Sequence, residues 1–474
     1  MNAIKIFTVC LFAWSAFSCK KVIEIKETDF INESLAYKTV ENTDQGAVGA
    51  YAAVIGEGNM YFNSIASDEV TSAEFPSQDA TVVNWIYGAD DITLTRDNTN
   101  TFGINYSVIN RANRVLAALP LADSTRIGDN ALRARLRGEM LALRAFMHFE
   151  MFRWYCDNYA PEGIALPYMK VASLTDQARI GMKAYFDNMA ADYAEARTLI
   201  PASYNDVYRV TRTAVIGMQA RMALYMRDWA NAETYATDYI ALLPLAARTD
   251  FSKIWKDSTS AEVAFKLKRL NTTLRPGSYY RGVSTNATNL QTILFTVSSK
   301  LWDAFDQTND IRFSAYAKDE PLLAAQGRPS HIVRKYEGTG YGTASDNVQD
   351  YKMIRTGEMY LIRAEARAEL SKITASSQDL NDLRKARINN YTVIDYNDKA
   401  TLINQIMAER FKELAFEGHR FWDLKRRSLP VERRPADAQN PTAVTLPANN
   451  LRFVLPIPFY EIQANKSIKQ NSGY

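Results

Sequence analysis

The segment Glu409-Arg-Phe-Lys-Glu-Leu-Ala-Phe-Glu-Gly-His-Arg-Phe-Trp-Asp-Leu-Lys-Arg426 lies at the end of a regular apolar pattern. Apolar residues recur there every three or four positions, which predicts one helix from about Ala400 to Lys425. These apolar residues are Ile403, Met407, Phe411 and Leu414. They share one helix face, so we expect that face to pack against a core. Charged residues at similar spacing could form salt bridges along the helix, namely Arg410, Glu413, Glu417, Arg420 and Asp423.

Helical periodicity also returns repeatedly upstream of this segment. It predicts helices over residues 43–54, 101–119, 131–155, 180–199, 211–227 and 229–242. Residues 214–236 resemble a tetratricopeptide helix pair, in which Gly217 and Ala220 allow close helix contact and Asp228 begins the turn. A similar pair is predicted for residues 353–370 and 377–388. The expected fold is mainly α, with tetratricopeptide-like helix pairs around one core.

Two regions, residues 60–100 and 245–350, have a different composition. Gly, Thr, Asn, Ser and Pro alternate there with aromatic residues, and Val263-Ala-Phe-Lys-Leu-Lys268 has the character of a short strand. We interpret both regions as loops and small strands on a helical scaffold. Recognition residues concentrate in loops that rigid elements hold in place, so a ligand-binding site is expected in these two regions.

The N-terminus has the features of an export signal. Lys5 precedes an apolar run over residues 6–17, which is too short to span a hydrocarbon core of about 30 Å. Ala16-Phe-Ser-Cys19 then resembles a lipobox, at which bacteria cleave the leader and acylate the new terminal cysteine. We therefore predict a signal peptide at residues 1–18, a lipid anchor on Cys19 and a single mature domain at residues 19–474.

The composition of the chain argues against binding of nucleic acid, an intrachain disulfide and a metal site. The chain has 56 Lys and Arg against 53 Asp and Glu, a balance unlike that of proteins that bind nucleic acid. Removal of the leader and lipidation of Cys19 would leave Cys156 as the one free thiol, which excludes an intrachain disulfide. The three histidines, His148, His331 and His419, lack metal-ligand spacing, so neither a metal nor a cofactor is predicted.

Several motifs together resemble the SusD/RagB family of surface nutrient-binding lipoproteins. The segment 409–426 resembles the signature helix of that family, and Leu455-Pro-Ile-Pro with the ending Lys469-Gln-Asn-Ser-Gly-Tyr474 resembles its C-terminus. Further matching blocks bring the resemblance to nearly all of the mature chain, around residues 49–51, 67–69, 109–113, 139–154, 209–212 and 354–384.

The chain departs from the family pattern at three places. Cys156-Asp-Asn-Tyr159 stands where Gly-Asp-Val-Pro is common, and Phe459-Tyr460 and Lys466 replace the more usual Gln-Ser and Pro. Lys20-Lys21 after the predicted lipidated cysteine are less acidic than typical surface-export signals, which leaves a periplasmic orientation open.

The resemblance implies a helical lipoprotein that binds oligosaccharide and covers a SusC-like TonB-dependent barrel as its lid, facing the cell surface. Two alternatives keep the fold and change the function. One is the same transport role with oligopeptide cargo, and the other is a periplasmic tetratricopeptide-type adaptor that binds a protein. Bound peptides in the native complex would identify the first, and protection from protease in intact cells would identify the second.

Aromatic residues in the two loop regions are the predicted ligand contacts, because flat rings stack on sugar faces. Family members often place a sugar-stacking tryptophan in the first region, where Trp85 and Tyr87 lie. The full set of predicted contacts also includes neighbouring polar residues that can bond hydroxyl groups: Asn84, Trp85, Tyr87, Asn271, Arg275, Tyr279 and Tyr280.

A hydrolase is a further alternative, and it needs two carboxylates in unlike environments. Asp68-Glu69 and Asp90-Asp91 are candidates by residue type, but adjacent acids point in different directions and loop acids are usually solvated. Arginines one helical turn away would keep Glu413 and Glu417 ionised. We therefore predict a binding protein and not an enzyme.

Overall fold

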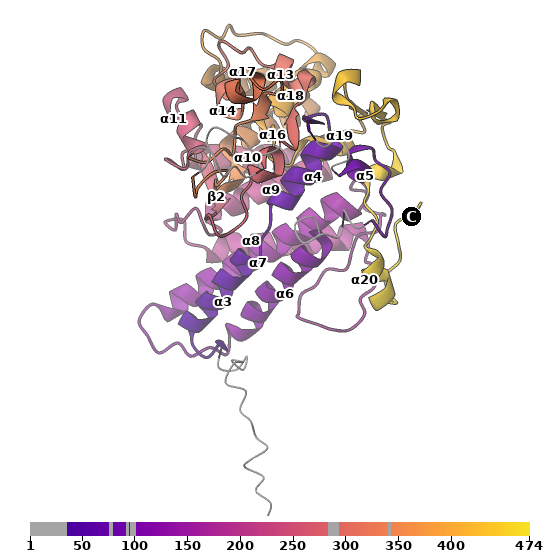
Figure 1. Ribbon diagram of the computed structural model, residues 1–474. Coiled ribbons are helices and arrows are strands. Elements are labelled where there is room, and N and C mark those ends of the chain that lie inside the picture. The colour runs from indigo at the N-terminus through magenta and orange to yellow at the C-terminus, as the bar shows by residue number, and fades with distance from the viewer. Residues whose placement is uncertain (1–35, 75–78, 92–93, 95–100, 283–292, 340–342) are drawn as a thin grey trace, which may run out of the picture.

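Long helices lie side by side in the first half of the chain, as Figure 1 shows. The computed structural model describes residues 36–74, 79–91, 94, 101–282, 293–339 and 343–474. The long helices are α3 (Val40–Ala52), α6 (Thr101–Ala118), α7 (Asp129–Tyr155), α8 (Met182–Leu199), α9 (Arg212–Met226) and α10 (Trp229–Leu242). Each lies within three residues of its predicted bounds. The mainly α fold is thereby confirmed.

Helices α9 and α10 form the predicted tetratricopeptide-like pair. The Thr211 side chain accepts a hydrogen bond from the backbone N of Ala214 at 3.1 Å, which caps α9, and Asp228 caps α10 through Asn231 N at 3.2 Å. A Cβ placed on Gly217 would lie 2.5 Å from Cγ2 of Ile354, so glycine is required where α9 approaches β6 (Tyr351–Arg355).

A second pair consists of α16 (Thr356–Glu369) and α17 (Ile373–Arg387), which pack on each other, and α16 also packs on α10. The prediction was wrong at its first bound, because residues 353–355 belong to β6 and not to the helix. Met353 and Ile354 form a short apolar run at the end of a largely buried strand, and periodicity alone cannot separate such a run from the helix that follows it.

The strands form three small antiparallel sheets. The largest has the order β1-β3-β5-β4, with Val70 opposite Val297 and Ala317 opposite Val333. The predicted strand at residues 263–268 is confirmed as β2, which pairs with β6. The strands other than β6 are β1 (Val70–Ser72), β2 (Val263–Leu267), β3 (Phe295–Val297), β4 (Ala317–Asp319), β5 (His331–Val333), β7 (Val431–Glu432) and β8 (Thr445–Leu446).

Short helices connect these parts. They are α4 (Glu57–Ala66), α5 (Ala80–Val83), α11 (Arg248–Ile254), α12 (Ser278–Arg281), α13 (Ser299–Ala304), α14 (Ile311–Tyr316), α15 (Pro321–Ala324), η3 (Pro435–Asp437), η4 (Pro441–Ala443), η5 (Leu451–Phe453) and α20 (Phe459–Ala464). Helix α4 is buried along its whole length, and in Figure 1 it lies between the long helices and the sheet-containing part of the molecule.

The predicted helix over residues 400–425 was wrong at its centre. The chain forms α18 (Lys399–Glu413) and α19 (Arg420–Arg426), separated by residues 414–419, which we name the signature turn. Phe416 and Gly418 have φ values of 62° and 82° there, and this left-handed conformation ends a right-handed helix. A Cβ on Gly418 would lie 2.6 Å from Nδ2 of Asn59, so the close contact with α4 requires glycine.

The break redirects the charged residues predicted to bridge along one helix. Arg410 and Asp423 do pair, at 2.7 Å, but across the signature turn. Glu413 and Glu417 both bind the guanidinium of Arg355, at 2.5 and 2.7 Å, and Arg420 binds Asp68 at 2.7 Å. These ion pairs therefore connect distant parts of the chain.

The signature turn is held by side chains from several elements. Lys335 Nζ donates to the backbone O of Ala415 at 2.7 Å, and the hydroxyl groups of Tyr336 and Tyr351 donate to the backbone O of Phe416 and Glu417, each at 3.1 Å. Lys335 is thus buried at this turn together with the charged residues Arg355, Glu413 and Glu417. Buried polar atoms of this kind need their hydrogen-bond partners in place.

One hydrophobic core contains residues from Val40 to Ile468, including Phe411 of the predicted stripe. The other residues of that stripe, Ile403, Met407 and Leu414, are buried in a smaller core. Within the part of the chain that the structure describes, no helix combines the length and hydropathy needed to cross a bilayer. The predicted signal peptide and Cys19 lie outside the described residues, and the single-domain boundary stays a prediction.

Candidate ligand-binding site

Both regions predicted as loops and small strands also contain short helices, which is a correction, and helix α4 at the start of the first region contacts residues from both. From the first region, Trp85 Nε1 donates to the backbone O of Ala66 at 2.8 Å, and the Tyr87 ring lies 6.3 Å from Phe62. From the second region, Tyr279 lies 5.0 Å from Tyr61 between ring centroids, and the hydroxyl groups of Tyr280 and Ser64 are 3.0 Å apart. Four predicted aromatic residues, separated by nearly 200 positions in sequence, therefore contact one short helix.

Three of these rings are enclosed. Trp85 is 5% exposed and lies under the guanidinium of Arg433, at 4.2 Å from its ring centroid. Tyr87 and Tyr280 have no exposed surface, and the Tyr87 hydroxyl donates to the backbone O of Arg452. In this structure the three rings pack their own loops against α4 and offer no open face to a ligand.

The other predicted contacts are more accessible. Asn271 is exposed. Arg275 is half-buried, and its Nη2 donates to the backbone O of Asn271 at 3.1 Å. Asn84 is part of an amide chain, donating to Gln439 at 2.9 Å and accepting from Asn440 at 2.8 Å. The half-buried Tyr279 has a buried hydroxyl group without a hydrogen-bond partner among the described residues. These four residues stay predicted contacts.

A surface aromatic pair in the second loop region was not predicted. The rings of Trp302 and His331 are stacked, with centroids 3.8 Å apart and planes inclined by 3°. Trp302 is half-buried and His331 is exposed, so the outer face of the imidazole meets solvent. Their sequence separation of 29 positions gives no signal of this contact.

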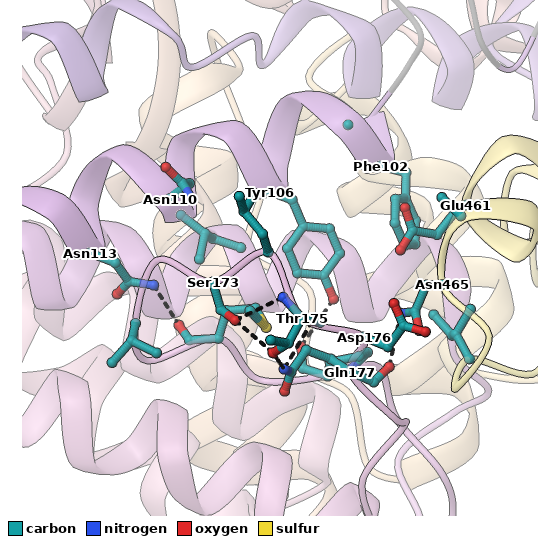
Figure 2. Close-up of a pocket in the computed structure, with 18 of the residues that line it drawn as sticks. Phe102, Tyr106, Asn110, Asn113, Ser173, Thr175, Asp176, Gln177, Glu461 and Asn465 are labelled. Carbon is teal, nitrogen blue, oxygen red and sulfur yellow. Dashed lines mark hydrogen bonds between the residues drawn. The ribbon is translucent and has the colours of Figure 1, made fainter.

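A pocket of about 290 Å³ lies elsewhere, between α6, the loop from Pro167 to Gln177 and α20. Figure 2 shows side chains from these three segments facing one another, with Tyr106 and Phe102 on α6 and Glu461 on α20. Its volume is near the lower end of the range of about 300–1,000 Å³ that is typical of small-ligand sites.

Hydrogen bonds fix the walls of this pocket. The Tyr106 hydroxyl donates to the backbone O of Pro167 at 3.0 Å, and Asn113 Nδ2 donates to the backbone O of Met169 at 2.9 Å. On the opposite side, Asn465 Nδ2 donates to the backbone O of Gln177 at 2.9 Å. The loop is therefore tied to both helices, and the pocket is formed before any ligand arrives.

The pocket is acidic. Asp176 and Glu461 line it, and none of its described lining residues is a lysine, arginine or histidine. Burial raises the pKa of Glu461, and the negative charge of Asp176 raises it further, against a hydrogen bond with Asn465 that lowers it. Amides and hydroxyl groups complete the polar lining, while Tyr106 and half-exposed Tyr460 supply ring surface. Such a site suits a neutral polyol or a cationic group.

Sequence reasoning missed this pocket, although one signal was available. Tyr460 belongs to the Phe459-Tyr460 departure from the family's C-terminal motif, and it lines the pocket. The sequence identifies this departure but does not place the C-terminal segment beside α6, so it gives the departure no role in a site.

Asp68 and Glu69, one of the two acid pairs considered for hydrolysis, differ in pKa as a catalytic pair would, but both side chains are buried. Burial raises the pKa of Glu69 to about 7, whereas Arg420 and then Lys300 hold the pKa of Asp68 well below its usual range against the opposing effect of burial. Glu69 accepts from Ser64 Oγ at 2.7 Å and from Phe416 N at 3.1 Å. Both carboxylates are thus occupied by structural partners.

The side chains of His148 and Cys156 are also buried. His148 is buried, its ring nitrogens lie 3.0 Å from the Tyr185 hydroxyl and 3.2 Å from Met169 N, and burial lowers its pKa to about 3. Cys156 is buried, which raises the pKa of its thiol to about 11. Over the residues that the structure describes, no three His, Cys, Asp or Glu side chains are grouped as metal ligands.

Comparisons with known proteins identify two family models along the chain. The model described as the SusD family matches residues 271–474, and a model described as starch-binding and associating with the outer membrane matches residues 26–224. SusD-like protein P38 of Formosa agariphila is 24% identical over 96% of each chain. SusD-like protein P2 of the same organism is 30% identical over 38% of this chain and 35% of its own.

Solved structures show the same fold. A SusD superfamily protein from Bacteroides thetaiotaomicron has a TM-score of 0.79 at 21% identity, over 91% of this chain and 99% of its own. A laminarin-binding SusD-like protein has a TM-score of 0.73 at 19% identity, over 92% of this chain and all of its own.

Proposed function

Because the chain belongs to the SusD/RagB family, we propose that it is an outer-membrane lipoprotein that binds oligosaccharide at the cell surface. It delivers this cargo to a SusC-like TonB-dependent barrel and covers the barrel as a lid. Acyl chains on Cys19 hold it to the membrane. The family assignment is the observation that carries the proposal, and the carbohydrate-binding relatives support the class of cargo.

The pocket of Figure 2 is the proposed cargo site that the geometry supports best. Sugars combine apolar ring faces with hydroxyl groups, and the pocket offers Tyr106 and Tyr460 beside amides and hydroxyls. If each ring contributes about 1 to 1.5 kcal/mol, the two together leave binding weak. Weak capture suits a lid, because a second contact on the barrel raises the effective concentration and release stays fast.

The acidic lining favours uncharged glycans. A uronate or sulfate group would lie close to Asp176 and Glu461 without a basic residue among the described lining to balance it. Like charges within a few ångströms repel by an amount that partial burial increases. We therefore propose neutral or amino sugars as cargo.

The accessible loop residues form a second proposed contact surface. Asn84, Asn271 and Arg275 keep polar groups near solvent, and half-buried Tyr279 could offer part of its ring. The stacked pair Trp302 and His331 lies in the same loop region of the sequence. Trp85, Tyr87 and Tyr280 could meet cargo if their loops opened. A long oligosaccharide would then contact the protein away from the pocket as well.

Oligopeptide cargo is the second candidate, because a lysine or arginine side chain would also complement the acidic pocket. The lining of the pocket also supports peptide cargo. Val171 and Leu174 are exposed there and could contact apolar side chains of a peptide. The proposed activity in either case is binding without turnover. A periplasmic adaptor role would require protection of the protein from protease added to intact cells.

Calorimetry with a panel of neutral, amino, carboxylated and sulfated oligosaccharides tests the proposal, together with purification of the native protein from outer membranes. We expect binding of a neutral or amino member and co-purification of a barrel. Absence of binding by every glycan, together with absence of a barrel, would overturn the proposal. If mass spectrometry instead recovers peptides from the native complex, the cargo is peptide and not glycan.

A further inference from the structure

A small cavity lies where the helical half of the chain meets the signature turn. Its volume is about 30 Å³, and its lining includes Asn105 of α6, Glu150 and Arg153 of α7, and Glu417 and His419 of the C-terminal half. The cavity therefore joins elements from both parts of the chain matched by the two family models.

Three buried polar atoms of its lining residues lack a hydrogen-bond partner among the described residues. They are Asn105 Nδ2, Glu150 Oε1 and Arg153 Nε, and all three side chains are more than nine-tenths buried. The remaining groups of the ion pair are used: Arg153 Nη2 binds Glu150 Oε2, and Arg153 Nη1 donates to the backbone O of Gly418 at 3.2 Å. Buried polar groups in folded proteins are almost always paired, so these three require an occupant.

The chemistry of the three atoms identifies the occupant. Asn105 Nδ2 and Arg153 Nε are donors, and Glu150 Oε1 is an acceptor. The two donors disfavour a cation, and the carboxylate oxygen disfavours an anion. A water molecule accepts two hydrogen bonds and donates two, and a cavity needs about 10–15 Å³ to hold one. A sugar or a peptide side chain does not fit in about 30 Å³.

We propose that this cavity is a binding site for one or two ordered water molecules, which hydrogen-bond Asn105, Glu150 and Arg153 and join α6 and α7 to the signature turn. The direct contacts beside the cavity support this position. Asn59 Nδ2 donates to the backbone O of Gly418 at 3.3 Å, and Trp422 Nε1 donates to Asn59 Oδ1 at 2.8 Å. The water completes the polar contact between the two halves, and this role is independent of cargo.

A crystal structure of the full mature protein at about 1.5 Å resolution or better tests the proposal directly. We expect solvent density within hydrogen-bond distance, about 2.7–3.2 Å, of Asn105 Nδ2, Glu150 Oε1 and Arg153 Nε. The proposal is overturned by a cavity without density, or by a rearrangement in which the three groups pair with protein atoms. Density that refines as an ion would also overturn it.

A variant gives a second, functional readout. Asn105→Leu keeps the branched shape of the side chain, replaces the donor by a larger methyl group and leaves the water with fewer partners. Asn188→Leu is the matched control, because Asn188 lies half-buried on α8 outside the cavity lining. We expect Asn105→Leu to lower the Tm more than the control and to lose solvent density. Equal Tm values with unchanged density would contradict the proposed role. Should Asn105→Leu not fold, the wild-type crystal structure decides.

Discussion

Nζ of Lys335 lies 2.6 Å from Oε1 of Glu417, with both side chains almost completely removed from solvent. The ammonium also donates to the backbone O of Ala415, and the other oxygen of Glu417 binds Arg355 at 2.7 Å. Two cations from the β-strand region thus hold one carboxylate of the signature turn. This arrangement fixes the turn and not a ligand, because its charged groups are bound by protein partners. Arg355 also pairs with Glu413 at 2.5 Å, which supplies a second carboxylate.

Glu417→Gln is expected to destabilise the protein by about 3–5 kcal/mol, because it leaves Lys335 and Arg355 buried with less compensating charge. Chemical denaturation measures the change. The matched control is Asp187→Asn, which removes the exposed partner of Lys183 and should leave stability unchanged within error. Similar losses in both variants would contradict a special cost of the buried site.

Glu69 is expected to make the free energy of unfolding depend on pH. Its folded pKa is raised to about 7 by burial, above the ordinary value of 4.5, so the folded state binds the proton more tightly. This contribution is fully present below pH 4.5 and is lost as the pH rises through about 7. Glu69→Gln removes the titration, so urea unfolding between pH 4.5 and 7 should show a smaller decline than in the wild type. Parallel curves would show that Glu69 does not titrate in this range.

Gly418→Ala is expected to cost about 1–3 kcal/mol, because a residue with a side chain is strained at φ 82°. The added Cβ would also displace Asn59. Gly49→Ala is the control, since a Cβ there meets nothing within 4 Å and alanine favours the helix by about 0.5–1 kcal/mol. Thermal unfolding of the two variants should therefore change in opposite directions, and a neutral Gly418→Ala would show that the turn tolerates side chains.

Tyr460→Ala is expected to weaken binding of a neutral oligosaccharide about 5- to 12-fold, the factor for loss of about 1–1.5 kcal/mol of ring contact. Phe459→Ala is a close control, because Phe459 is adjacent and similarly exposed but does not line the pocket. Calorimetry with the best glycan of the panel gives both values. Equal affinities of the two variants would place the cargo site elsewhere, and the same assay with Arg275→Ala would then test the loop surface.

Glu461→Gln should change the preference for charge. Removing one carboxylate relieves repulsion, so a mannuronate hexamer should gain affinity relative to a neutral mannose hexamer of the same linkage. The gain should be largest above the raised pKa of Glu461, where the wild-type side chain is ionised. Glu162→Gln, an exposed residue outside the pocket lining, is the control. An unchanged ratio of the two affinities would show that Glu461 does not face the cargo.

The sequence was sufficient to predict most of the helical scaffold, because amphipathic periodicity depends on local spacing. It failed at residues 414–419, where the apolar stripe and charged spacing continue through a turn. That turn forms because Asn59, Glu69 and Lys335 bind it, and these residues are distant in sequence. Long-range contacts of this kind are not encoded in the spacing of neighbouring residues.

The candidate site was predicted less completely for the same reason. Residue type identified aromatic loop residues, but it could not distinguish Trp85 and Tyr87, whose polar atoms bind backbone carbonyl groups in the core, from Tyr460, which lines a pocket. Burial depends on which segments meet, and α20 meets α6 across more than 300 residues of chain.

The signature turn has a consequence for synthesis. Asp68 and Glu69 bind Arg420 and Phe416, so these two residues cannot complete their buried contacts until about nine-tenths of the polypeptide has been made. Contacts of such long sequence separation slow folding. The long helices can contact one another earlier, but Asp68 and Glu69 gain these native partners only when the signature turn and α19 have been made.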